Sequence, residues 1–152
     1  MIRACLAALS VAAAAPVAAQ TAIDCTGWQA SAQNIPEPWQ ANTRTFANGD
    51  VRVTLLDTIE PAAGAYYLMV LAPPYDELGS RYCAIIAEGD GGVGFAGMQF
   101  DQTSASYDPA TGLTVWVPTR LFAPETGGFD DALLGVIIDQ AAGTIKPFFE
   151  LH

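Results

Sequence analysis

Histidine is almost absent from this chain of 152 residues, in which the single histidine, His152, is the last residue. Histidine is the usual general base because its pKa lies near neutrality, and chain ends are generally mobile. The sequence therefore argues against histidine-dependent catalysis, and the hydrolase motif G-x-S-x-G is missing as well. Zinc is disfavoured too, because clusters of histidine and cysteine supply its usual ligands.

Positive charge is also scarce. The chain has 6 Lys and Arg residues against 16 Asp and Glu residues, a formal net charge of −10. A field of this sign repels phosphate backbones and anionic lipid headgroups, so we expect no nucleic-acid partner and no adsorption to membrane surfaces. It keeps a protein dispersed in water and favours cationic partners.

Long hydrophobic runs are limited to the N-terminus. Arg3 precedes an apolar run, 6–15, and small residues follow at 16–19. This order predicts a signal peptide, residues 1–19, that is cleaved after Ala19 and directs the chain to a periplasmic or secreted location. The run is too short and too rich in alanine for a stable membrane span of about 20 residues, so we expect no membrane insertion of the mature chain. Residues 20–152 fall within the usual size of one domain.

Cysteine occurs three times, and Cys5 lies inside the predicted signal peptide. Cys25 and Cys83 are then expected to form one disulfide in an oxidising compartment. A redox or nucleophilic thiol would need a C-x-x-C motif or a histidine that lowers the thiol pKa, and the sequence offers neither. The bond would tie an N-terminal segment to a core strand.

Proline and glycine divide the rest of the chain into short segments. Pro36 and Pro38 argue against regular structure in an N-terminal segment, 20–43. Beyond it, apolar and polar residues alternate with the period of a half-buried strand, as in 51–58. The expected strands are 44–47, 51–58, 65–71, 82–87, 93–100, 104–107, 113–121, 135–139 and 144–151.

The turn residues suggest how these strands connect. Asn48-Gly49 suits a tight hairpin turn, and the run 93–100 is expected to pair with 82–87 across a glycine-rich turn. A helical turn or two is expected at 130–134. About eight short strands predict an all-β fold, either a small antiparallel β-sandwich or a closed β-barrel.

The segment 89–94 contains the literal motif G-x-G-x-x-G. Dinucleotide binding requires a helix that starts at this motif and an acidic residue about 20 positions further on. Poor helix formers follow the motif and the acid is missing, so we interpret the segment as a turn. The sequence predicts no cofactor.

Strand parity indicates the candidate ligand-binding residues. In 113–121 the apolar side chains at alternate positions face one way, which places Trp116 and Arg120 together on the other face. Tryptophan and arginine are enriched at binding hot spots. Trp39 would join this patch if its loop folds back over the sheet. Alternatively, both tryptophans plug the open ends of the core.

These observations favour an exported, non-catalytic binding or interaction module of the cell envelope. Its partner would be a cationic envelope protein, such as a lysozyme-like hydrolase, or a glycan. The alternative is a carboxylate-dependent hydrolase, or a glycan- or calcium-binding domain, that acts on envelope polysaccharide. Its acids would come from the expected loops, at Asp76-Glu77, Asp101 with Asp108, or Asp130-Asp131.

Overall fold

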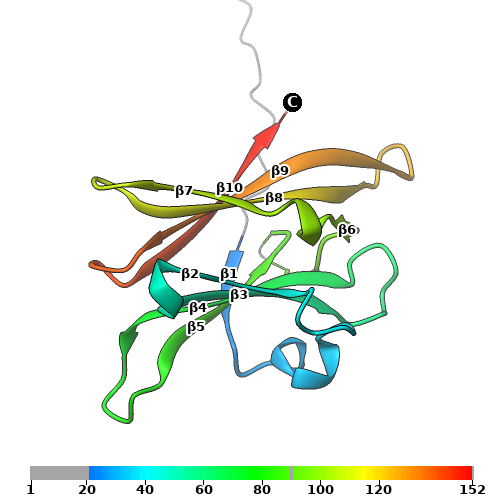
Figure 1. Cartoon of the computed structure of the whole chain (residues 1–152). Helices are drawn as coiled ribbons and strands as arrows, with labels where there is room; N and C mark the ends of the chain where they lie inside the picture. The colour runs from blue at the N-terminus through cyan, green and yellow to red at the C-terminus, as the bar shows by residue number, and fades with distance from the viewer. Residues whose placement is uncertain (1–20, 90, 152) are drawn as a thin grey trace, which may run out of the picture.

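The computed structural model describes residues 21–89 and 91–151, which form two antiparallel five-stranded sheets (Figure 1). The first sheet has the strand order β1-β5-β4-β3-β2, and the second has the order β10-β9-β8-β6 with β7 also paired to β8. The described strands do not close into a barrel, so the fold is the sandwich, one of the two predicted architectures. The strands are β1 (Thr21–Asp24), β2 (Thr43–Phe46), β3 (Val51–Asp57), β4 (Tyr66–Tyr75), β5 (Arg81–Ala87), β6 (Gly97–Met98), β7 (Ser104–Asp108), β8 (Gly112–Ala123), β9 (Gly128–Asp139) and β10 (Thr144–Leu151). The predicted signal peptide and His152 lie outside the described residues.

The core lies between the two sheets and consists of side chains at alternate strand positions. Val51, Val53 and Leu55 of β3 point inward, as their period predicts, and all are buried. In the second sheet, β8 and β9 contribute Leu113, Val115, Val117, Leu134, Val136 and Ile138 to the same cluster. Each such side chain stabilises the fold by about 1.5 to 3 kcal/mol on burial.

The predicted hairpin at Asn48-Gly49 is confirmed. Phe46 pairs with Val51, and the short 3-10 helix η3 (Ala47–Gly49) makes the turn between β2 and β3. Three consecutive residues have positive φ: 51° at Ala47, 55° at Asn48 and 97° at Gly49. Asparagine and glycine tolerate this left-handed backbone better than other residues, which explains why this dipeptide marks the turn.

The predicted pairing of 93–100 with β5 is wrong. The free edge of β5 is taken by β1, where Ile23 pairs with Ile85. The chain instead crosses from the first sheet to the second: Phe95 bridges Tyr66 beside β4, and only β6 pairs in the second sheet, with β8. After β6 the 3-10 helix η4 (Phe100–Gln102) leads into β7. Phe95 and Phe100 are buried in the core along this crossing.

The predicted helix at 130–134 is also wrong, because this segment is part of β9. β8 and β9 form one long hairpin in which Arg120 pairs with Asp131 and Phe122 with Phe129. The turn between them includes Gly127, with a φ of 67°. Cross-strand pairing and packing override the weak local preference for helix here.

The N-terminal segment is irregular from 25 to 42, as predicted, but its first described residues form β1, which was not predicted. It contains two 3-10 helices, η1 (Trp28–Ala30) and η2 (Ala32–Asn34). The predicted disulfide is confirmed: Cys25 and Cys83 are bonded, with their Cα atoms 5.8 Å apart. Such a bond is typical of an oxidising extracytoplasmic environment.

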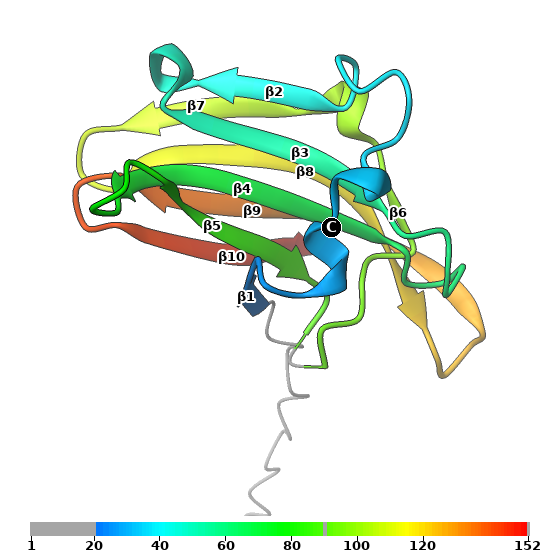
Figure 2. The same ribbon diagram turned by 90° about the horizontal axis from the view of Figure 1, so that it is seen from below.

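The disulfide-tethered segment covers part of the outer surface of the first sheet (Figure 2). A second, smaller apolar cluster lies beneath it, built from Leu56, Tyr67, Ile85 and Ala87. Ala30 and Ile35 pack against this cluster. Within the described ranges the helices are short 3-10 turns, and none is long and apolar enough to cross a bilayer.

Candidate functional site

The two outer surfaces of the sandwich differ. The outer surface of the first sheet carries the disulfide-tethered segment, whereas no described segment lies over the outer surface of the second sheet (Figure 1). On that bare surface Trp116, Leu133, Ile137 and Phe148 are only partly buried, although all four are large and apolar. An uncovered apolar sheet surface is a candidate interaction site.

An aromatic pair stands at the middle of this surface. Trp116 of β8 and Phe148 of β10 meet edge to face, with ring centroids 5.2 Å apart and ring planes at 80°. Both lie over Gly135 of β9, where a Cβ atom would come within 2.8 Å of Trp116 Cζ3 and still closer to Phe148 Cζ. Gly135 therefore leaves the space over β9 that the two rings occupy, because any side chain at this position would collide with them.

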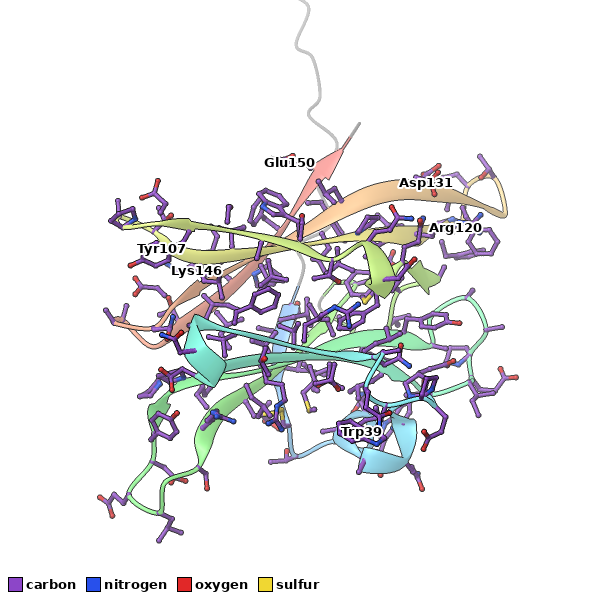
Figure 3. The ribbon with its side chains drawn as sticks, viewed as in Figure 1. Trp39, Tyr107, Arg120, Asp131, Lys146 and Glu150 are labelled. Carbon is purple, nitrogen blue, oxygen red and sulfur yellow. A yellow bond between two sulfur atoms is a disulfide. The ribbon has the colours of Figure 1, made fainter. Side chains whose placement is uncertain are left out.

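A second aromatic pair lies on the β8–β9 hairpin, towards its tip. Phe122 and Phe129 are 40% and 47% exposed, with centroids 6.0 Å apart. The guanidinium of Arg120 lies 4.8 Å from the centre of the Phe129 ring, and its Nε is 3.6 Å from the Asp131 carboxylate. Figure 3 shows Arg120 and Asp131 side by side on this hairpin. We call Trp116, Phe148, Phe122 and Phe129, with Arg120, the aromatic face.

Trp116 and Arg120 thus lie on the same side of β8, as strand parity predicts, but Trp39 does not join them. Trp39 lies beside the first sheet, on the opposite side of the sandwich (Figure 3), where it lines a groove of about 370 Å³ with Ile35, Met69 and Leu71. The proline-rich loop connects β1 to β2, which are the two edge strands of the first sheet, and it lies against that sheet. Neither tryptophan plugs an end of the core: Trp39 is 54% exposed and Trp116 is outside the core cluster.

A hollow of about 330 Å³ opens at the end of the sandwich, next to the aromatic face. Among the described residues that line it, Glu88, which directly follows β5, is the one with an ionisable side chain. Burial raises the pKa of this carboxyl to about 7, although the Phe122 backbone amide acts in the opposite direction. The hollow is lined by Pro61, Ala63, Gly64, Glu88, Val93, Phe122 and Pro124.

One of the acidic pairs considered for catalysis is divided by the sheet, and one acid of another pair is engaged in a turn. Asp130 and Asp131 are consecutive residues of β9, so their side chains leave opposite faces of the sheet. Asp76 is part of the β4–β5 turn, where its carboxylate accepts hydrogen bonds from the amides of Ser80 (2.7 Å) and Leu78 (2.9 Å). These bonds hold the pKa of Asp76 below its usual value.

In residues 21–89 and 91–151, no three side chains of His, Cys, Asp or Glu gather as a metal site would require. No protein-family model, curated protein or solved structure matches the chain.

Sequence reasoning missed several residues of the two sites. Phe129 was missed because it lies outside every expected strand, just before the mistaken helix at 130–134, so no parity could be assigned to it. Gly135 was placed at the start of the expected strand 135–139, but the strands on either side of it, which bring Trp116 and Phe148 to it, were not known. The signal for Glu88 was present: it is an acid that directly continues the buried run Ala84–Ala87. A carboxyl in such a position is held partly out of water by its own strand.

Proposed function

We propose that this chain is an exported, non-catalytic binding module of the periplasm or cell exterior, and that it docks a cationic protein on its aromatic face. The observation that carries the proposal is the asymmetry of the sandwich. The chain covers one outer surface with its own tethered segment, and it leaves on the other surface aromatic rings and an arginine, the residue types most enriched at binding hot spots.

The ring geometry favours a protein partner over a glycan. A sugar ring stacks on a flat aromatic surface, but the planes of Trp116 and Phe148 are at 80° and those of Phe122 and Phe129 at 64°. Such rings form ridges and recesses rather than one flat platform. An irregular apolar surface with a polar rim is what protein interfaces use.

The charge of the chain favours a cationic partner. The formal net charge is −10, and on this side of the molecule Arg120 is paired with Asp131, while the exposed Lys146 of β10 lines a shallow pocket with Asp139. Asp131 is 88% exposed, and Glu150 of β10 is exposed as well. Complementary charge speeds the encounter and restricts the choice of partner.

Affinity capture tests this function. Tagged residues 20–152 are incubated with the envelope fraction of the source cell at low and at moderate salt, and each retained basic protein is purified and titrated by calorimetry. We expect its affinity to fall with salt, and Phe129→Ala to weaken it about tenfold or more. Trp39→Ala is the matched control, because Trp39 is similarly exposed on the opposite side of the sandwich.

Two results would contradict the proposal. If the partner bound the Phe129→Ala and Trp39→Ala variants alike, the aromatic face would not be the docking site. If only polysaccharide were retained, or if the pure protein turned over an envelope substrate, the binding-module function itself would be wrong.

A further inference from the structure

The Glu88 hollow is a preformed feature of the sandwich end. The amide of Gly64 donates to the carbonyl of Pro61 (2.8 Å), and the amide of Gly94 donates to the carbonyl of Gly64 (3.1 Å). A Cβ atom at Gly64 would lie 2.7 Å from Val93 Cγ1, so the two walls approach as closely as glycine allows. A site with fixed walls loses little conformational entropy on binding.

A third backbone hydrogen bond holds the main chain at the acid: the amide of Glu88 donates to the carbonyl of Val93 (2.8 Å). The rim is apolar and open, with Val93 51% and Phe122 40% exposed. The hollow therefore combines an apolar rim with the carboxyl of Glu88.

That carboxyl has no cationic partner. In the described part of the chain the one ion pair is that between Arg120 and Asp131, and the other described residues that line the hollow carry no ionisable group. A partly buried carboxylate without a compensating charge is costly, and a cation brought beside it would relieve that cost. The net negative charge of the molecule also concentrates cations at its surface.

We propose that this hollow binds a primary ammonium group on an aliphatic chain, as a lysine side chain carries, with the ammonium against Glu88 and the chain against Val93 and Phe122. One carboxylate suffices for an ammonium, whereas calcium needs six to eight oxygen ligands. Phe122 borders both this hollow and the aromatic face. The assignment of this lysine to the docked partner rests on the proposed function. The binding of an ammonium group by the hollow is independent of that function.

The probe for the test is n-butylammonium chloride, the analogue of a lysine side chain. It is titrated at pH 8 into the 15N-labelled chain, residues 20–152, and amide shifts are recorded by NMR against sodium chloride of equal ionic strength. We expect saturable shifts at 61–64, 88 and 93, and weaker binding of the neutral analogue n-butanol. Glu88→Gln should lower the affinity at least about tenfold, the value of a hydrogen bond to a charged group.

Glu125→Gln is the matched control. It removes the same charge from an exposed position in the neighbouring β8–β9 turn, outside the hollow. We expect it to bind n-butylammonium as the unmodified chain does. Equal losses in both variants would show a general charge effect and overturn the proposal, as would equal binding of n-butanol and n-butylammonium.

The unmodified chain supplies a second measurement that needs no variant. Among the described residues that line the hollow, Glu88 is the one that titrates, and burial raises its pKa to about 7. The affinity for n-butylammonium should therefore be constant above about pH 8 and fall about tenfold per unit below pH 6, as the carboxylate gains its proton. An affinity that is unchanged between pH 5.5 and 8 would contradict the assignment.

The two proposals fail separately. If the hollow binds n-butylammonium but no basic protein is captured, the ammonium site stands and the proposed function is wrong. If a basic protein docks on the aromatic face but n-butylammonium does not bind in the hollow, the proposed function stands and the ammonium site is wrong.

Discussion

Removal of the disulfide by the double substitution Cys25→Ser and Cys83→Ser should weaken the fold more than any single surface change. The bond joins residues 58 positions apart. In the chain-entropy description, closing a loop of this length lowers the free energy of folding by about 4 kcal/mol at 25 °C. Domains of this size are stable by only about 5 to 15 kcal/mol, so the variant should lose a large share of its total stability.

The loss should be uneven across the molecule. The bond anchors the segment that covers Leu56, Tyr67 and Ile85, the smaller apolar cluster of the first sheet. Without the anchor, β1 and the two short 3-10 helices should detach at a lower free energy than the rest of the sandwich. The second sheet contains neither cysteine and should keep its protection.

Urea denaturation followed by circular dichroism measures the first effect, and native-state hydrogen exchange measures the second. We expect a drop of about 4 kcal/mol in the free energy of unfolding. Amides of β1 and of Ile85–Ala87 should exchange early, while those of β8 and β9 stay protected. A drop below about 1 kcal/mol, or early exchange in both sheets alike, would refute the anchoring argument.

Three further predictions concern single positions. The Glu88 carboxyl has a pKa raised from 4.5 to about 7, so the folded chain holds a proton that the unfolded chain releases, and stability should fall as the pH rises from about 4.5 to 7. Because this carboxyl is only partly buried, we expect the free energy of unfolding to fall by about 1 to 2 kcal/mol over this pH range. Urea denaturation of the wild type and of Glu88→Gln at each pH measures this fall. An equal pH dependence in the two proteins would contradict the prediction. Gly135→Ala should push Phe148 from Trp116, cost about 1 to 3 kcal/mol and change the near-UV circular dichroism of Trp116; an unchanged spectrum would count against the packing described. Leu134→Ala, at a fully buried position, should cost about 2 to 5 kcal/mol in the same urea assay, and a loss below that of a surface substitution would contradict its place in the core.

The parts of the fold that were predictable have a local cause. The alternation of Val51, Val53 and Leu55 gave both the strand and its buried side, because successive side chains of a strand point to opposite faces. Asn48-Gly49 marked its turn because few residues tolerate the left-handed backbone there. Cys25 and Cys83 were the one pair left outside the predicted signal peptide.

The parts that were not predictable depend on partners distant in sequence. The segment 93–100 looked like a partner for β5, but β1 competes for that edge and the chain crosses to the other sheet. The acids and glycines near 130 favoured a turn of helix when this segment was considered alone. In the structure the segment pairs with β8 and is a strand. The side of the sandwich on which Trp39 lies depends on β1 and β2, the strands that flank its loop, which both join the first sheet.

The sequence by itself determined the all-β class, the disulfide pair, the acidic character of the chain and the shared face of Trp116 and Arg120, because each follows from composition or from a period of two along one strand. Only the tertiary structure decided which outer surface is covered, that Phe148 and Gly135 complete the aromatic face, and that Glu88 borders a hollow. These depend on which strands become neighbours, and that choice is set by competition among distant segments for the same edges and the same core.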